Sequence, residues 1–290
     1  MSEYKKLRET GSGIEILVNE DGEKRYAVDL ETHMIISKRQ QESYRQKKEM
    51  RGKNWVACYH KTIREVIKRL SLDEMGAMIK LLPYMRFNKE GRLIDNGKPM
   101  GRAEIARAIG KSEAQTKRLL SALVKHGVLR TEKDGRRNIY VVEPEFHTMG
   151  FTHDSPFTKL YQTFARNKLE RLTTQQAGVL YAVLPFFHFK TFRLVHNPDE
   201  RNEELIEPMT HGELAEMLGI DEKTLYRHMN ALMDIGVIMQ SRMSRIVLYT
   251  VHPDLMYRLD YASPYVEVVR KQFKDFQRAR QRRKRNKDLF

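Results

Sequence analysis

The sequence contains an internal duplication, and this feature restricts the fold more than any other. Residues 69–85 read RLSLDEMGAMIKLLPYM and residues 171–187 read RLTTQQAGVLYAVLPFF, so Arg, Leu, Gly, Leu and Pro coincide. Residues 104–129 and 213–238 match in the same way, and a third, shorter block follows each of them. Three blocks in one order, with spacing that changes in a single loop, indicate two copies of one structural unit.

The first block of each copy has the signals of a helix. Ser-x-x-Glu at 71–74 and Thr-x-x-Gln at 173–176 form capping boxes, in which the hydroxyl and the long polar side chain each accept from a free backbone N–H. The apolar residues that follow recur at helical spacing. Pro83 and Pro185 stand near the expected ends, where the missing N–H and the ring clash stop a helix.

The second block predicts two helices joined by a tight turn. Gly110 and Gly219 supply the positive φ that a helix end needs, and Ser112 and Asp221 are suited to cap the next helix. Leu120, Leu123 and Val124 are expected to face inward in copy one, as are Leu225, Met229, Leu232 and Met233 in copy two.

The third block predicts a β-hairpin with a basic tip. The second helix ends at Gly127 or Gly236, a strand begins at Val128 or Val237, and a strand with Tyr-x-Val-x-Pro returns in each copy. Arg and Lys residues occupy the turn between the two strands. Two helices followed by such a hairpin are the order of a winged helix.

Over residues 57–146 and 159–255 the chain therefore resembles the winged helix-turn-helix superfamily. The fold class that this resemblance implies is mainly α with small β-hairpins (α+β), with two winged helix-turn-helix domains in tandem. Four divisions of the chain are expected. They are a β-hairpin and basic segment (1–54), winged helix domain 1 (55–150), winged helix domain 2 (151–260), and a basic C-terminal helix or tail (261–290).

Copy one departs from the pattern at two positions. Lys111 stands where copy two has Ile220, and Thr116 stands where it has Leu225. Apolar side chains at these positions pack between the two helices in the superfamily. Copy one is therefore expected to be rotated or less tightly packed.

The resemblance implies a partner, double-stranded DNA, with the second helix of each unit in the major groove. The early, outward positions of these helices are the candidate base contacts: Ser112, Glu113, Gln115, Lys117 and Arg118, and Glu222, Lys223, Thr224, Tyr226 and Arg227. The hairpin tips are expected to meet phosphate or the minor groove, through Lys133, Arg136, Arg137, Arg242 and Arg245.

The C-terminal segment combines an apolar stripe with a basic run. Ser263 and Pro264 are typical of a helix start, and Val266, Val269, Phe273 and Phe276 follow at steps of three and four. Docking of this stripe on the body of the protein is favoured over pairing of two chains. The run at 278–287 is expected to follow phosphates, with Arg282, Arg283 and Lys284 as its contact residues.

The composition also agrees with a DNA-binding protein. The formal charge of +15 favours polyanions, and one cysteine suits a reducing compartment. No run of about 18 apolar residues and no leader peptide is visible, so a cytoplasmic, DNA-associated protein without membrane contact is expected. Residues 13–30 alternate around an Asp-Gly turn, as in a β-hairpin, whose role is left open between an interaction module and a cover.

No catalytic or metal motif is found in the sequence. The Gly-Lys-Ser at 110–112 lacks the earlier glycine of a phosphate-binding loop, because Ile105 stands there. The ten histidines lack metal-ligand spacing. We therefore expect no cofactor, no metal and no enzymatic activity, and a nuclease or relaxase that cuts DNA with a divalent metal is kept as a further alternative hypothesis.

Two winged helices flanked by basic segments resemble plasmid and phage replication initiators. This resemblance implies a site-specific replication initiator, with a transcriptional regulator of a phage or mobile element as the alternative. A winged helix that binds only protein is the third hypothesis. A homodimer and the host replication or transcription machinery are further candidate partners.

Overall fold

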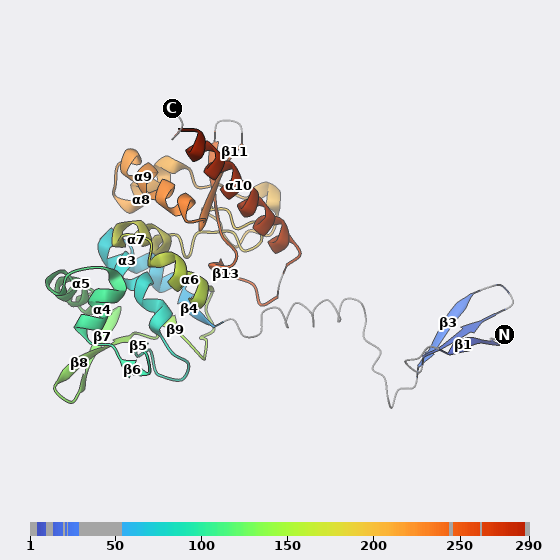
Figure 1. The fold of residues 1–290 in the computed structure, drawn as a ribbon, viewed down its shortest axis with the longest axis horizontal. Helices are drawn as coiled ribbons and strands as arrows, with labels where there is room; N and C mark the ends of the chain where they lie inside the picture. The colour runs from blue at the N-terminus through green and yellow to red at the C-terminus, as the bar shows by residue number, and fades with distance from the viewer. Residues whose placement is uncertain are drawn as a thin grey trace. The chain divides into compact units, whose positions relative to one another are not determined.

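The computed structural model describes residues 5–9, 14–19, 21, 23–28, 54–243, 246–261 and 263–287 (Figure 1). The chain divides into two compact units, at 1–51 and at 52–290. Helices and small antiparallel sheets make up the described residues, so the α+β class is confirmed. The four-part division of the chain stays a prediction, since both copies of the repeat lie within the second unit.

The N-terminal unit is a three-stranded antiparallel sheet of β1 (Lys5–Glu9), β2 (Ile14–Val18) and β3 (Lys24–Val28). The strands β2 and β3 form the hairpin that the alternating sequence predicts. The strand β1 pairs with β2, and no alternation predicts it, because four of its five residues are charged. Charged residues are typical of edge strands.

The first copy of the repeat runs through a strand, helices and a hairpin. Its elements are β4 (Trp55–Tyr59), α2 (His60–Val66), α3 (Leu72–Leu81), η1 (Leu82–Tyr84), β5 (Ile94–Asp95), β6 (Lys98–Pro99), α4 (Arg102–Ile109), α5 (Glu113–Lys125), β7 (Leu129–Asp134), β8 (Arg137–Val142) and β9 (His147–Thr148).

The second copy repeats most of this order. Its elements are β10 (Phe157–Tyr161), α6 (Gln162–Leu169), α7 (Thr174–Ala182), η2 (Glu203–Leu205), α8 (His211–Leu218), α9 (Glu222–Asp234), β11 (Ile238–Met243), β12 (Ile246–Val251) and β13 (Met256–Tyr257). Among its described residues it has no counterpart of η1 or of the β5–β6 pair, and it has a short 3-10 helix, η2, in the loop before α8. The long helix α10 (Tyr265–Lys287) follows.

The two copies share a sheet with local two-fold symmetry. The strand order is β13-β10-β4-β9. Ala57 pairs with Lys159, and these residues are separated by the same 102 positions that relate Arg69 to Arg171. At the two edges of the sheet, β9 pairs with β4 and β13 pairs with β10, and equivalent residues of the two copies form equivalent pairs. A residue that pairs with its own equivalent lies on a two-fold axis, so the copies are related like the subunits of a symmetric dimer.

Helices α3 and α7 cross at this axis in close contact (Figure 1). A Cβ on Gly76 would stand 1.7 Å from the carbonyl oxygen of Thr174, and one on Gly178 would stand 2.1 Å from that of Leu72. Leu72 and Thr174 are equivalent residues, as are the two glycines, so the contact is reciprocal. Glycine at both positions lets the backbones approach this closely.

The predicted starts and ends of the helices are confirmed. Capping boxes are present at Ser71 and Thr173, and Gly110 and Gly219 have φ values of 73° and 63°. Within copy two, all of the residues predicted to face inward on the second helix are buried.

Of the two expectations for copy one, the inward position of Val124 is wrong and the looser packing is not tested. Val124 is 37% exposed, although Leu120 and Leu123 are buried. Val124 follows Leu123 in the last turn of α5 and points to a different side of the helix. Its side chain therefore lies at the edge of the core. Thr116 is fully buried at the position that Leu225 fills in copy two, and its hydroxyl is buried without a hydrogen-bond partner among the described residues. The looser packing or rotation expected of copy one stays a prediction.

Helix α10 docks on the body of the second unit, as its apolar stripe predicts. Val266, Val269 and Phe273 are buried. Further along, the Gln277 side chain donates to the carbonyl oxygen of Met233 at 2.5 Å. Among the described residues, no helix is both long and apolar enough to cross a bilayer.

The helix crossing generates a stability prediction. Gly76→Ala is expected to lower the free energy of unfolding by about 2 kcal/mol or more, since its Cβ would collide with backbone. In Gly212→Ala, the matched control in α8, the new Cβ meets only the end of the Glu222 side chain, so a change within about 1 kcal/mol is expected. Urea denaturation measures both, and equal effects would contradict the role of the crossing.

Candidate nucleic-acid interface

In copy one, a tight turn aims α5 away from α4. The left-handed Gly110 ends α4, and Ser112 begins α5 with a capping box. The Ser112 hydroxyl accepts from the Gln115 N–H at 3.3 Å, and the Gln115 side-chain oxygen accepts from the Ser112 N–H at 3.2 Å. This reciprocal pair sets the direction of the first turn of α5, which the sequence assigns to base contact.

Copy two builds the same arrangement with a different cap. The left-handed Gly219 ends α8, and the Asp221 carboxylate accepts from the Thr224 N–H at 2.8 Å. The side chain of Tyr226 is exposed, and that of Arg227 is exposed and donates to the Thr224 hydroxyl at 2.8 Å. The side chain of Thr224 is half-buried.

The predicted base-contact residues differ in the partners that they have. Glu113 is ion-paired with Arg102 at 3.2 Å, and the Gln115 oxygen is held by the cap. Lys117 and Arg118 are exposed, and within residues 54–243 neither has an ion pair. These two cations are therefore the groups of α5 best able to meet a polyanion. The remaining predicted contacts of α9, Glu222 and Lys223, are exposed at its first turn.

The β7–β8 hairpin of copy one carries its predicted cations in two different states. Lys133 and Arg136 are exposed at the tip. Arg137 instead turns back and donates to the Glu104 carboxylate of α4 at 2.9 Å. This ion pair holds the hairpin against α4, and the Glu104 carboxylate partly neutralises the charge of Arg137.

In copy two, the hairpin β11–β12 lies beside α10, and the two form a groove with α9. Side chains of Tyr226, Arg242 and Arg283 line this groove together. Arg242 is exposed on β11, whereas the predicted contact Arg245 lies outside the described residues. The groove therefore joins predicted contacts from three separate segments of the sequence.

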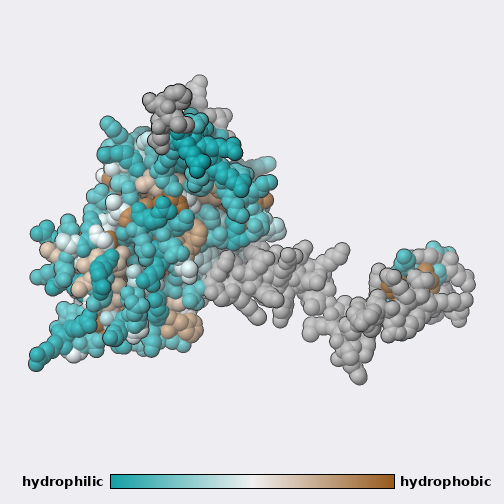
Figure 2. Space-filling model, viewed as in Figure 1, coloured by the Kyte–Doolittle hydropathy of each residue, from teal (hydrophilic) through white to brown (hydrophobic). Residues whose placement is uncertain are grey.

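The predicted contacts of α10 also divide into paired and exposed side chains. Lys284 is paired with Asp234 of α9 at 2.8 Å, while Arg282 and Arg283 are exposed. Arg280 donates to the same Asp234 carboxylate at 2.5 Å. Figure 2 shows hydrophilic side chains over the C-terminal half of α10 and over the β7–β8 hairpin.

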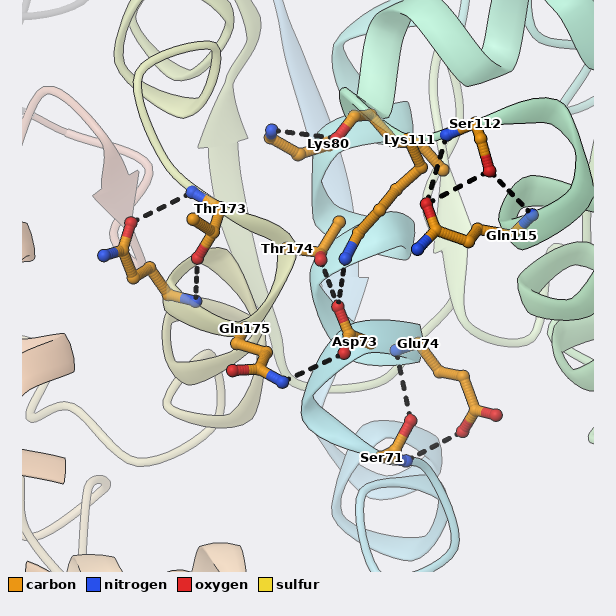
Figure 3. A network of polar contacts seen from close by, with 12 residues as sticks. Ser71, Asp73, Glu74, Lys80, Lys111, Ser112, Gln115, Thr173, Thr174 and Gln175 are labelled. Carbon is orange, nitrogen blue, oxygen red and sulfur yellow. Dashed lines mark hydrogen bonds and ion pairs between the residues drawn. The ribbon is translucent and has the colours of Figure 1, made fainter. Parts of the chain in front are cut away.

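A polar network links the turn of copy one to copy two (Figure 3). The ammonium of Lys111, in the turn before α5, lies 3.0 Å from the Asp73 carboxylate on α3. Asp73 also accepts from the hydroxyl of Thr174 and, at 3.1 Å, from the side-chain nitrogen of Gln175. Lys111 departs from the apolar pattern because its charge is paired here.

Lys80 makes a second link of this kind. Its ammonium is buried and donates to the carbonyl oxygen of Ile109 at 3.2 Å and to that of Leu172 at 2.7 Å. Burial lowers the pKa of Lys80. The end of α4 in copy one is thereby tied to the segment that precedes α7 in copy two.

The sequence did not predict this network. Copy two has Ile220 and Gln175 where copy one has Lys111 and Asp73, so the repeat offers no signal for it. One signal was present at Lys80, a lysine inside the apolar stretch of α3. Arg280 was likewise missed as a partner of α9, since the sequence shows it only within a basic run.

One segment from each copy of the repeat matches a known protein family. Residues 207–239, which span α8 and α9, match the family described as winged helix-turn-helix DNA-binding. Residues 92–144, which span α4, α5 and the β7–β8 hairpin, match the O-methyltransferase dimerisation domain. The first match supports DNA binding by the chain through a winged helix-turn-helix unit in copy two.

Searches of curated proteins and of solved structures returned no match to the chain. Across the described residues, no group of three or more His, Cys, Asp or Glu side chains is arranged to hold a metal ion.

The network around Asp73 generates a pH-dependent prediction. Partial burial acts to raise the pKa of this carboxyl, but hydrogen bonds from Thr174, Lys111 and Gln175 outweigh burial and hold the pKa below its usual value. A lowered folded-state pKa contributes stability above the unfolded-state pKa, and the contribution is lost as the pH falls through the folded-state value. Asp73→Asn is expected to lose about 1–2 kcal/mol at neutral pH.

The difference between this variant and the natural chain is expected to shrink below about pH 4. Urea unfolding of both proteins at neutral and acidic pH, followed by circular dichroism, measures it. Glu65→Gln, an exposed carboxylate on α2, is the control and is expected to behave alike at both pH values. An Asp73→Asn loss that is as large in acid as at neutral pH would contradict the ionic network.

Proposed function

We propose that the chain binds a specific double-stranded DNA site through both copies of the repeat, each acting as a winged helix. The match of α8 and α9 to winged helix-turn-helix DNA-binding proteins carries this proposal. Copy one supports its extension, because α4, Gly110, α5 and the β7–β8 hairpin follow in the same order and with the same left-handed turn. The proposal assigns binding, and no catalysis, to this chain.

Within DNA binding, we favour initiation of plasmid or phage replication, and transcriptional regulation is the alternative. Both roles use the same surfaces, and the place of the site on DNA distinguishes them. Fragments of the source replicon can be selected with the full chain and footprinted. Protection of repeated sequences beside an origin supports initiation, whereas protection confined to a promoter supports regulation.

A homodimer is part of the proposal. The match of residues 92–144 to a dimerisation domain supports it. Host replication or transcription proteins remain proposed partners, to be tested once a DNA site is known.

Arg227 generates the first binding prediction. Its guanidinium lies on the exposed face of the first turns of α9, and arginine there donates two bonds to a guanine edge. Arg227→Ala is expected to reduce discrimination at one base position roughly tenfold, with weaker effects elsewhere in the site. Selection from a random DNA library measures the preference of each protein.

The control for Arg227 is Arg171→Ala, an exposed arginine that stands before α7 and outside the candidate interface. It removes the same charge and is expected to leave the preferred sequence unchanged. An unaltered preference in Arg227→Ala, with normal DNA binding, would remove Arg227 from base contact.

The exposed arginines of α10 generate a salt-dependence prediction. Arg282→Ala with Arg283→Ala is expected to reduce the slope of log Kd against log salt by about 1.8, because each phosphate contact contributes about 0.9. The sequence preference is expected to stay unchanged.

Lys271→Ala with Lys274→Ala is the matched control, since it removes two exposed cations from the first half of the same helix. Fluorescence anisotropy titrations across a salt series measure both slopes. An equal drop in the two double variants would mean that only net charge matters and that α10 has no defined contact with DNA.

A further inference from the structure

The two candidate recognition helices, α5 and α9, are related by the symmetry of the scaffold. Helix α5 packs on α3 and α9 packs on α7, and the axis passes through the crossing of α3 and α7. Figure 1 shows α4 and α5 on one side of that crossing and α8 and α9 on the other. A two-fold rotation leaves the position of each element along the axis unchanged and reverses every direction that is perpendicular to the axis. Under this symmetry, α5 and α9 lie at one height along the axis, and the components of their directions perpendicular to the axis are opposite.

A symmetric pair of recognition helices reads DNA in a defined way. In dimeric helix-turn-helix proteins, a two-fold axis that coincides with that of the duplex presents the same element to the two strands in opposite directions. The DNA site then has inverted halves, with centres about 10 base pairs, one helical turn, or a multiple of this apart. In this chain the two-fold relation exists within one polypeptide.

The exposed faces of α5 and α9 are partly alike and partly different. The shift of 109 residues that relates Glu104 to Glu213 places Arg118 opposite Arg227. The same shift sets Ala114, Gln115 and Lys117 of α5 against Lys223, Thr224 and Tyr226 of α9. The two helices therefore share this arginine and the exposed Glu113/Glu222 pair, and they differ at the exposed positions 114/223 and 117/226.

From this relation we infer that one chain reads an inverted pair of unlike half-sites. The halves share the base pair read by Arg118 in one arm and by Arg227 in the other, a guanine by the chemistry of arginine. They differ at the adjacent base pairs, which Lys117 meets in one arm and Tyr226 in the other. The inference rests on the proposed function, since it requires both copies to bind one duplex.

Orientation of the half-sites is the direct test. The full chain is titrated against the duplex selected from a random library, against the same duplex with one half reversed at constant centre spacing, and against each half alone. Reversal is expected to weaken binding at least about tenfold, as is loss of either half. Equal or tighter binding to the reversed duplex, or to one half alone, overturns the inference.

A symmetrised variant provides a second test. Ala114→Lys and Lys117→Tyr together give α5 the two fully exposed side chains by which α9 differs, and both positions are exposed, so the fold is expected to tolerate them. Gln115 is kept because it caps α5. This variant is expected to prefer a perfect inverted repeat of the half-site bound by α9, by about tenfold over the natural site. Retention of the natural preference overturns the inference.

These experiments separate failure of DNA binding from failure of the inverted arrangement of the half-sites. If the full chain binds no duplex, the proposed function itself fails. If it binds duplex DNA but protects only the half bound by α9, or prefers direct repeats, the proposed DNA binding stands and the inverted-site inference fails. Arg118→Ala and Arg227→Ala report on this separately, because each is expected to relax one arm only.

Discussion

The close crossing of α3 and α7 supports the rest of the second unit. Gly76 and Gly178 let each helix lie against a backbone carbonyl of the other, a contact that no side chain would permit without displacement. The shared sheet continues the same symmetry through the pairing of Ala57 with Lys159. Because α5 and α9 pack on these two helices, the geometry of the crossing sets the relation between the two candidate DNA-reading surfaces.

Polar contacts then break the symmetry. Lys111, Asp73 and Lys80 tie the helix turn of copy one to the beginning of α7 in copy two, and copy two has no matching set at the equivalent positions. In copy two, α10 packs beside α9 and extends its surface with exposed arginines. The two copies thus have the same scaffold but different electrostatic surroundings, as expected of surfaces that bind unlike sequences.

The repeat and its capping residues could be predicted from the sequence because they depend on neighbours within one turn. Ser112 with Gln115, and the glycines after α4 and α8, are local signals that tertiary packing does not alter. The symmetric crossing was not predicted, since Gly76 and Gly178 show their purpose only when α3 and α7 meet. Val124 was misplaced because periodicity does not tell where a core ends.

The polar network lay beyond prediction for a related reason. Asp73 and Thr174 are 101 residues apart, and neither carries a local motif that names the other. At the candidate interface, the sequence identified the exposed cations of α5 and α9, but it did not show that Arg137 and Lys284 have partners within the chain.

The central claim is that α5 and α9 both lie against one DNA duplex. Cys58 is buried, so a cysteine placed at Lys117 or at Tyr226 can be labelled selectively with a chelate of iron that cleaves nearby DNA. The two labelled proteins, each bound to the same selected duplex, are predicted to cut it at two separate positions, one in each half of the site. Cleavage from position 226 with none from position 117 would contradict the account.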